Sequence, residues 1–407
     1  MTDVPEIRFK GYTDAWEQRK LGEVAETTFW GGTPSTSNYD FWNGNIPWIQ
    51  SSDISEHNVS NVNLRKYITE KGLETSAAKL VPAKSIAVVI RVGVGKLSVV
   101  PFDFATSQDF LSLANLNIDI WFGVYALYKR MQKEITYVQG TSIKGITKDE
   151  LLNIIMSIPS TLPEQIAIGR FIHTLDNTIT LHQRKLDGLK KLKAGYLQQM
   201  FPQAGESVPK VRFTGFVGGW KTRELGTISI KVTQKNKNSE FTETFTNSAE
   251  YGIINQRDFF DKDISNEKNL DGYYIVQPND FVYNPRISNY APVGPIKRNL
   301  LGRTGVMSPL YYVFRIVDGD FNFIEKYFES ISWHEFMKLN GDNGVRSDRF
   351  NIKDSVFEKM PIQFPKYQEQ TAIGNFFRNI DEQITNQSQK LEQIKQLKSA
   401  YLQKMFV

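Results

Sequence analysis

The residue types that carry out catalysis are few and scattered in this chain of 407 residues. Cysteine is absent, which excludes disulfides, thiolate nucleophiles and cysteine-bound zinc. Histidine occurs at only four positions, His57, His173, His182 and His334. The segment HEFMK, which begins at His334, resembles the start of a zinc-protease helix but lacks the second histidine that would bind the metal.

Two glycine-containing segments also miss the spacing that catalysis requires. In Gly93–Leu97 (GVGKL), a leucine stands where a phosphate-binding loop has the Ser or Thr that binds magnesium. In Gly140–Gly145 (GTSIKG), the spacing of a nucleophile elbow is missed by one residue. Carboxylates are plentiful, but no pair of them stands out. We therefore predict a non-catalytic binding component that holds no cofactor or metal of its own.

The composition is that of a globular protein of two or three domains. The net charge of +5, from 49 basic and 44 acidic residues, permits nucleic-acid binding without indicating it. The apolar run Ile86–Ile90 is far shorter than the roughly 20 residues of a membrane span. The first residues lack the apolar core of a signal peptide. We expect a cytoplasmic protein that does not bind membranes.

The elements that could position functional residues come from a duplication of the chain. Near the start of each copy, PEIRFKGYTDAWEQRKLG (Pro5–Gly22) aligns with PKVRFTGFVGGWKTRELG (Pro209–Gly226). Near the end of each copy, EQIAIGRFIHTLD (from Glu164) aligns with EQTAIGNFFRNID (from Glu369). KLDGLKKLKAGYLQQMF (from Lys185) likewise aligns with KLEQIKQLKSAYLQKMF (from Lys390). The segments between them, body 1 (about residues 23–160) and body 2 (about residues 227–365), show little mutual resemblance.

The closing segment of each copy has the pattern of a long coiled-coil helix. Alternating steps of four and three residues place apolar residues on one stripe of each helix, and a helix of this length would extend roughly 55 Å. The stripe positions are Ile168, Ile172, Leu175, Ile179, Leu186 and Leu189, and Ile373, Phe377, Ile380, Ile384, Leu391 and Ile394. Lys193 and Lys398 occupy matching polar positions and are expected to fix the register. The alternative is a pair of ordinary core helices.

The two bodies have the pattern of mixed α/β structure. Strand-like runs separated by Gly, Pro and Asn are predicted at 85–92, 96–100, 273–277, 280–283 and 310–317. The repeated Trp16 and Trp220, Tyr196 and Tyr401, and Phe201 and Phe406 are interpreted as packing residues.

Together, these repeated segments resemble a specificity subunit of a type I restriction–modification enzyme over nearly the whole chain. Gly31–Ser35 (GGTPS) and Ile46–Ile49 (IPWI) are similar to the opening of many first recognition domains of that family. Tyr283–Arg286 (YNPR) and Met307–Tyr311 (MSPLY) are similar to another type of recognition domain.

The resemblance implies an α+β fold of two globular domains joined by two antiparallel coiled-coil helices, with pseudo-two-fold internal duplication. The implied boundaries are residues 1–160 and 209–366 for the target recognition domains, 161–201 and 367–407 for the spacer helices, and 202–208 for a linker. Each domain would read one half of a split, asymmetric site in double-stranded DNA. Half-sites on one face of B-DNA lie near whole turns apart, about 34–36 Å each.

The resemblance also implies the partners and cofactors. Two methyltransferase subunits would dock on the repeats and modify adenine, and restriction subunits would add ATP-dependent translocation and cleavage. S-adenosylmethionine, ATP and Mg would then be bound by those subunits and not by this chain. The alternative functions are a coiled-coil scaffold or adaptor without DNA specificity, and a stand-alone nuclease or methyltransferase, which the absent motifs disfavour.

If the bodies read DNA, their contacts should be side chains that pair with base edges, such as Arg, Asn, Gln, Ser and Thr in loops. The candidates in body 1 are Thr33, Ser35, Ser37, Asn38, Ser51, Arg91, Lys96, Ser107, Gln108, Thr141, Ser142 and Lys144. The candidates in body 2 are Gln256, Arg257, Asn284, Arg286, Asn289, Arg298, Ser308, Arg346, Ser347 and Arg349. Any one of them could instead be an ordinary solvated loop residue.

Overall fold

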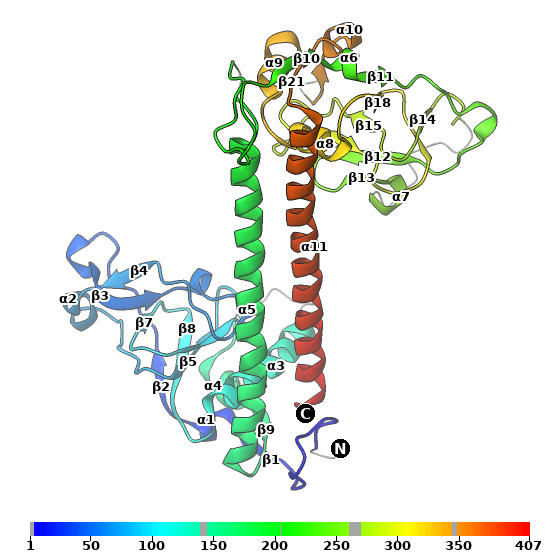
Figure 1. Ribbon diagram of the computed structural model, residues 1–407. Helices are drawn as coiled ribbons and strands as arrows, with labels where there is room; N and C mark the ends of the chain where they lie inside the picture. The colour runs from blue at the N-terminus through cyan, green and yellow to red at the C-terminus, as the bar shows by residue number, and fades with distance from the viewer. Residues whose placement is uncertain (1–3, 139–144, 204, 260–269, 344–347) are drawn as a thin grey trace. The chain divides into compact units, whose positions relative to one another are not determined.

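The chain forms two compact units, seen in a computed structural model that describes residues 4–138, 145–203, 205–259, 270–343 and 348–407. Unit 1 combines residues 1–184 with residues 388–407, and unit 2 comprises residues 185–387. The units therefore differ from the predicted domain boundaries, because each contains one body and parts of both long helices. The two long helices themselves, α5 (Leu162–Gln199) and α11 (Tyr367–Lys404), lie where the sequence predicts them (Figure 1).

Unit 1 is built around a four-stranded antiparallel sheet in the order β2-β8-β5-β6. A three-stranded sheet, β4-β3-β7, and the antiparallel pair β1-β9 complete the body. The strands are β1 (Glu17–Lys20), β2 (Ala25–Trp30), β3 (Trp42–Ile49), β4 (Lys66–Ile68), β5 (Ser85–Val89), β6 (Leu97–Val100), β7 (Ala105–Thr106), β8 (Phe110–Leu116) and β9 (Ile155–Ile158). The helices are α1 (Leu21–Val24), α2 (Glu70–Glu74), α3 (Ile120–Val138) and α4 (Lys148–Leu152), with short 3₁₀ helices η1 (Tyr39–Phe41) and η2 (Ser51–Asp53).

Unit 2 contains a four-stranded antiparallel sheet in the order β11-β18-β15-β16, with four further strand pairs. The strands are β10 (Lys221–Glu224), β11 (Ser229–Lys231), β12 (Phe245–Ser248), β13 (Gly252–Asn255), β14 (Tyr274–Val276), β15 (Phe281–Tyr283), β16 (Ile296–Arg298), β17 (Gly305–Met307), β18 (Tyr312–Ile316), β19 (Asp342–Asn343), β20 (Phe350–Asn351) and β21 (Pro361–Phe364). The helices are α6 (Leu225–Ile228), α7 (Gln256–Phe259), α8 (Phe321–Glu329), α9 (His334–Asn340) and α10 (Asp354–Phe357), with η3 at Lys237–Ser239.

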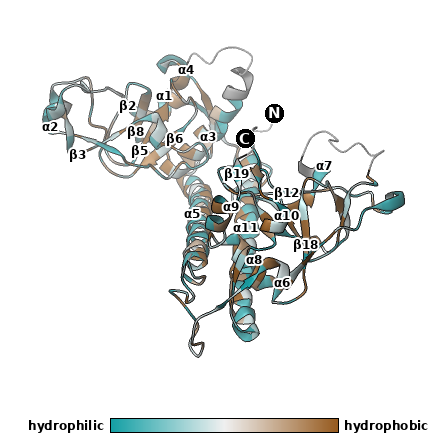
Figure 2. Cartoon of the chain, turned by 90° about the horizontal axis from the view of Figure 1, so that it is seen from above, coloured by the Kyte–Doolittle hydropathy of each residue, from teal (hydrophilic) through white to brown (hydrophobic). Residues whose placement is uncertain are grey.

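The main sheets of the two bodies share one topology despite the dissimilar sequences of the bodies. In both sheets, the strand in second place, β8 or β18, is the last of the four along the chain. The strands in third and fourth place form a hairpin, β5-β6 or β15-β16. Each body is also closed by an antiparallel pair, β1-β9 or β10-β21, that joins its first strand to its last. All five predicted strand runs are confirmed, as β5, β6, β14, β15 and β18. Hydrophobic residues line the main-sheet strands of both bodies (Figure 2).

The long helices pack antiparallel within each unit. In unit 1, Phe171 of α5 meets Tyr401 of α11 edge to face, at 4.8 Å between ring centroids. In unit 2, Tyr196 of α5 meets Phe376 of α11 in the same way, at 5.0 Å. All twelve predicted stripe residues are buried or partly buried, which confirms the coiled-coil pattern. Both hydrophobic and hydrophilic residues occur along α5 (Figure 2).

The repeated EQ pair fixes the start of each long helix to its own unit. Glu164 receives two hydrogen bonds from Arg8, at 2.6 and 2.8 Å, and Glu369 receives the same pair from Arg212, at 2.7 and 2.8 Å. The next residue, Gln165, accepts a hydrogen bond from the backbone N–H of Asp119 and donates one to the carbonyl of Pro159, each at 2.9 Å. In unit 2, the equivalent Gln370 accepts a hydrogen bond from the backbone N–H of Asp320 and donates one to the carbonyl of Pro365. These paired hydrogen bonds explain why the EQ residues recur in both copies.

The repeated glycine four residues later allows a second helix to approach the backbone of the long helix. A Cβ on Gly169 would lie 2.5 Å from the backbone nitrogen of Phe122, in the first turn of α3. A Cβ on Gly374 would lie 3.0 Å from the backbone nitrogen of Phe323, in the first turn of α8. Both distances are too short for a side chain, so each long helix passes its partner helix at close range.

The end of each long helix completes a hydrophobic core. Phe406, near the end of α11, lies in the core of unit 1, and its ring stacks on that of Phe122 at 5.4 Å. Phe201, just after α5, lies in the core of unit 2 and packs on Phe323 at 5.6 Å. The interpretation of the repeated phenylalanines and tryptophans as packing residues is confirmed, since Trp16 and Trp220 are also buried.

The polar stripe residues form ion pairs between the two long helices. In unit 1, the buried Lys398 contacts Asp176 at 2.5 Å, and Tyr125 donates a hydrogen bond to the same carboxylate at 2.6 Å. In unit 2, Lys193 contacts Asp381 and Glu329, each at 2.7 Å. These pairs give a physical basis for the expected role of the two lysines in fixing register, because a displaced helix would leave charged groups buried without partners.

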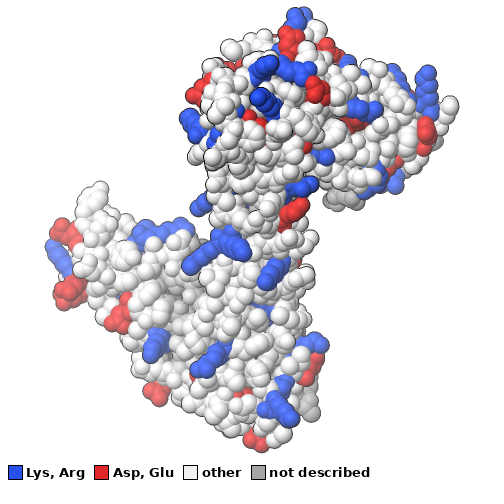
Figure 3. All heavy atoms as spheres, in the orientation of Figure 1, with Lys and Arg blue, Asp and Glu red and all other residues white. Residues whose placement is uncertain are grey.

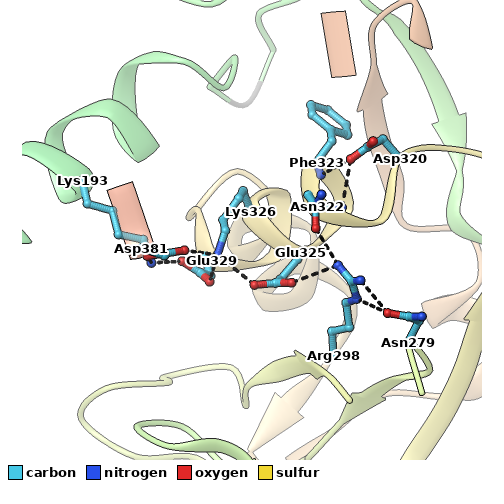
Figure 4. Close-up of polar contacts among 10 residues, drawn as sticks. All are labelled: Lys193, Asn279, Arg298, Asp320, Asn322, Phe323, Glu325, Lys326, Glu329 and Asp381. Carbon is cyan, nitrogen blue, oxygen red and sulfur yellow. Dashed lines mark hydrogen bonds and ion pairs between the residues drawn. The ribbon is translucent and has the colours of Figure 1, made fainter. Parts of the chain in front are cut away.

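Unit 2 adds a larger charge cluster, drawn in Figure 4. Lys326 of α8 reaches Glu325, Glu329 and Asp381 at 2.7–2.8 Å, and Arg298 reaches Glu325 at 3.3 Å. Burial alone would raise the pKa of the Glu329 carboxyl, but the nearby Lys326 and Lys193 lower it to about 2. The cluster therefore depends on Glu329 remaining ionised.

We predict that Gly169→Ala lowers the free energy of unfolding by about 2–3 kcal/mol, because the added methyl group overlaps backbone that cannot move aside. Gly188→Ala, on the same helix, is the control, since a Cβ at this position would have no neighbouring atom of another segment within 4 Å among the described residues. There the substitution should instead stabilise by about 0.5–1 kcal/mol. Thermal unfolding of both variants tests this contrast, and equal melting temperatures would contradict it.

We also predict a specific acid sensitivity of unit 2. The pKa of Glu329 is lower in the folded chain than its usual value of 4.5, so its contribution to stability is present above pH 4.5 and is lost as the pH falls toward 2. Glu329→Gln should destabilise the protein at pH 7 by on the order of 2–3 kcal/mol and flatten the loss between pH 4.5 and 2. Tryptophan fluorescence during urea unfolding at several pH values measures this. Glu335→Gln, which removes an exposed carboxylate of the same unit, is the control.

Candidate nucleic-acid interface

Five candidates of body 1 gather on one loop and on the turn beside it. The loop is Gly31–Asn38, which follows β2, and the turn carries Gln108, just before β8. Backbone bonds hold the loop, since the N–H of Gly31 donates to Phe110 at 3.2 Å and that of Gly32 donates to Thr106 at 2.8 Å.

The side chains of this loop are mostly polar and accessible. The hydroxyl of Thr33 donates to the Oε1 atom of Gln108, and the hydroxyls of Ser35 and Ser37 share a hydrogen bond of 2.9 Å. Asn38 uses its Oδ1 atom to accept from the N–H of Asp40 at 3.1 Å, which caps η1. The amide of Gln108 and the serine hydroxyls are exposed and have further hydrogen-bonding capacity.

The remaining candidates of body 1 are separated from this loop along the chain. Arg91 is exposed in the β5-β6 loop, and Lys96 of the same loop lies 3.6 Å from Glu56. Ser51 is half-buried in η2. Ser107 is a correction, because it is buried and its hydroxyl is 3.3 Å from a carboxylate oxygen of Asp109. Its side chain supports the turn and does not face a ligand.

Five candidates of body 2 line one cleft of about 540 Å³. They are Gln256, Asn284, Arg286, Ser308 and Arg349. The loop after β15 carries Asn284 and Arg286, and its backbone pairs with the segment that carries Arg349. The chain thus brings together residues that are far apart in sequence.

The polar groups of the cleft are held at different strengths. Asn284 is fixed by two bonds, from its Nδ2 to the carbonyl of Asn247 at 2.8 Å and from the N–H of Arg286 to its Oδ1 at 2.9 Å. The Arg286 side chain is 67% exposed and its guanidinium lies 3.9 Å from Asp348. An exposed pair at this distance is weak, so the guanidinium can be offered to a ligand.

Arg298 is a second correction to the predicted site. Its guanidinium is not available to a ligand, because it donates hydrogen bonds to Asn279 and Asn322 and forms an ion pair with Glu325 (Figure 4). The side chain is only 12% exposed. The residue sits at the end of β16 and joins this strand to α8, which gives it a structural function.

The other candidates divide simply. Arg257 and Asn289 are exposed in body 2, outside the cleft. Thr141, Ser142, Lys144, Arg346 and Ser347 lie outside the described residues. Four aromatic residues that were not among the candidates also line the cleft, namely Phe245, Tyr273, Tyr290 and Tyr311. Tyr290 is 81% exposed within a loop, and an aromatic residue among Ser, Asn and Pro was the available signal.

The matching topology places candidates of both bodies at equivalent loops. The β5-β6 loop of body 1 contains Arg91, and the β15-β16 loop of body 2 contains Asn284 and Arg286. In both bodies, this loop bonds to the segment that follows α3 or α9. The N–H of Ile146 donates to Ile90 at 2.8 Å, and the N–H of Phe350 donates to the carbonyl of residue 285 at 2.7 Å.

The face drawn in Figure 3 has no single dominant area of charge among its described residues. Basic side chains are scattered there over both units among acidic ones. In the described part of the chain, no group of three or more His, Asp or Glu side chains is placed to hold a metal ion. No helix there is both long and apolar enough to cross a bilayer.

We predict that the two arginines of body 2 differ in their effect on stability. Arg298→Ala should lower the free energy of unfolding by about 2–3 kcal/mol, because Glu325 and two amide oxygens lose their partner in a largely buried site. Arg286→Ala should change it by less than about 0.5 kcal/mol, since the side chain is exposed. Urea unfolding of both variants measures this difference. A small change in the free energy of unfolding for Arg298→Ala would contradict the structural role of Arg298.

Comparisons with known proteins agree with the family resemblance of the sequence. Residues 13–191 match the family described as the type I restriction modification DNA specificity domain. The type I restriction enzyme MjaIX specificity subunit of Methanocaldococcus jannaschii is 23% identical over 261 residues, 59% of this chain and 57% of the relative. The EcoR124I/EcoR124II specificity subunit of Escherichia coli is 28% identical over 183 residues, 43% of this chain and 44% of the relative. The chain spans about half the length of the curated relatives it matches.

Solved structures show the same fold over nearly the full chain. The type I restriction–modification S subunit of M. genitalium has a TM-score of 0.62 at 14% identity, covering 99% of both chains. A chain from a study of complex assembly and conformational transition of the type I restriction–modification system has a TM-score of 0.53 at 15% identity, covering 98% of this chain and 99% of that one. The family description names DNA specificity, which agrees with the prediction of a non-catalytic chain. In sequence over part of its length, and in fold over nearly all of it, the chain is similar to the specificity subunits of type I restriction–modification systems.

Proposed function

We propose that this chain is the DNA-recognition component of a type I restriction–modification complex, and that each body reads one half of a split, asymmetric site. The observation that carries the proposal is a contrast within the molecule. The contacts at the start of the long helices are the same in both units, whereas the polar side chains at equivalent loops of the two bodies differ. Two readers on one frame would need this combination.

The side chains of the two bodies suit different base edges. Body 1 presents hydroxyls and a glutamine amide on the Gly31–Asn38 loop and its neighbouring turn. Body 2 presents Arg286, Arg349 and Asn284 around a cleft. Arginine pairs with guanine, while asparagine and glutamine pair with adenine, so unlike bodies should read unlike sequences.

The proposal assigns all chemistry to partner subunits. Two methyltransferase subunits would bind through the repeated segments, one on each copy, and would carry S-adenosylmethionine. Restriction subunits would carry ATP and Mg for translocation and cleavage. Because methylation requires the adenine to leave the base stack, those partners would also have to open the duplex.

We predict that replacing residues 1–160 by the recognition domain of another specificity subunit changes one half of the methylated motif and leaves the other half unchanged. The measurement is methylome sequencing of cells that express the cognate methyltransferase subunits with the parent chain or with the chimera. A chimera with identical motifs, or one in which both halves change, contradicts independent reading by the bodies.

The control is a chimera rebuilt with the chain's own residues 1–160 through the same junction. If the parent chain and its methyltransferase subunits produce no split motif, and a pull-down returns only proteins unrelated to DNA modification, the chain is a scaffold instead. DNA affinity that does not change with salt would point the same way, since phosphate contacts make binding salt-dependent.

A further inference from the structure

Two tryptophans of β3 bind the backbone of the Gly31–Asn38 loop of body 1. The indole N–H of Trp48 donates to the carbonyl of Gly32, and the indole N–H of Trp42 donates to the carbonyl of Ser35, each at 3.0 Å. The two acceptors lie three residues apart on the Gly31–Asn38 loop. The indoles therefore fix both its beginning and its middle.

The tryptophan pair is itself fixed by the sheet. The two rings meet edge to face, at 5.1 Å between centroids and an angle of 88°. Trp48 is 4% exposed, and its backbone pairs with Lys66 of β4. The ammonium group of Lys66 lies 5.6 Å from the Trp48 centroid and 5.8 Å from that of Trp42, within the range of a cation–π contact.

The first two residues of the loop are closely packed on their other side. A Cβ on Gly31 would lie 1.7 Å from the carbonyl oxygen of Ser107, and a Cβ on Gly32 would lie 2.2 Å from the backbone of Ala77. The start of the loop is thus held between the indoles on one side and the segments that carry Ser107 and Ala77 on the other. Its side chains start from a fixed position, which lowers the entropy lost when they bind a ligand.

One side chain beside this loop is oriented for a particular partner. The Thr33 hydroxyl donates to Oε1 of Gln108, which sets the direction of the glutamine amide. The exposed amide keeps its Nε2 donor and a second acceptor position on Oε1. A donor and an acceptor side by side match the N7 and N6 groups of adenine in the major groove.

We propose that Gln108, oriented by Thr33, reads an adenine in the half-site of body 1, and that Trp42 and Trp48 are positioning residues for this contact. The inference rests on the proposed function, because it names the contact through which body 1 would recognise DNA. It goes further in naming the base and in separating the residue that reads it from those that act through the loop backbone.

The first test uses the complex of the full chain with its methyltransferase subunits and a duplex that carries its methylated motif. Each adenine of one half-site is replaced in turn by 7-deazaadenine, which lacks the N7 acceptor. One replacement should weaken binding roughly 10- to 100-fold for the parent protein and have little effect in Gln108→Ala. Asn45→Ala, an exposed amide of β3, is the control and should behave as the parent.

Thr33→Val and Trp42→Phe test the orienting and positioning roles. Both should reduce discrimination against base changes in the body 1 half-site, while discrimination in the other half-site and the melting temperature stay unchanged. A purely structural role would lower the melting temperature together with the discrimination. Trp30→Phe is the matched control, since this exposed tryptophan of β2 lies outside the tryptophan clamp, which is formed by Trp42 and Trp48.

Several outcomes would overturn the inference alone. One is a Gln108→Ala variant that binds every modified duplex as the parent does. Another is an equal loss of affinity for specific and random DNA in that variant, which would identify a phosphate contact. Intact discrimination in Trp42→Phe would remove the positioning role. Absence of any split motif for the parent complex is a different result, because it would reject the proposed function itself.

Discussion

The close approach of each long helix to a second helix is the constraint on which both units depend. At Gly169 and at Gly374, the backbone of the long helix lies against the first turn of α3 or α8, at a distance that excludes any side chain. The neighbouring glutamine satisfies the N–H that this contact would otherwise bury. Since the sheet packs on α3 or α8, the position of the whole body relative to its long helix follows from this contact.

A fixed frame is useful only if the parts mounted on it can vary. The main sheets of the two bodies have the same strand order, yet the loops between their strands carry unlike polar residues. Buried strand residues support the fold, whereas loop side chains are free to change without loss of core packing. This division explains how one architecture can hold two unlike recognition surfaces.

Much of the fold could be predicted from sequence because its periodicity and its repeats are strong. The spacing of a stripe such as Ile168, Ile172 and Leu175 indicates a helix by itself, and the strand runs are bounded by Gly, Pro and Asn. Which segments make up each unit could not be predicted, because Phe201 and Phe406 stand in nearly identical sequences, YLQQMF and YLQKMF, and nothing in them says which core each one enters. Only packing determines that Phe406 completes the core of unit 1.

The candidate site could be predicted only in part, for a similar reason. Residue type identified Gln108 and Arg286, which are exposed, but it identified Arg298 and Ser107 equally. Ser107 is buried and Arg298 largely so, and Arg298 also has a carboxylate partner from a distant element, Glu325. The tryptophan clamp was also invisible, since the acceptors of its indoles are backbone carbonyls that have no sequence signature.

The placement of Phe406 in the core of unit 1 has a consequence for synthesis on the ribosome. Residues 1–184 emerge first, but their core lacks Met405 and Phe406 until about 200 further residues have been translated. During that interval, the apolar surface around Phe122 is exposed in the nascent chain. A premature stop codon shortly before Met405 would therefore injure the first half of the protein, which had been made intact, more than the second half, whose core is closed by Phe201.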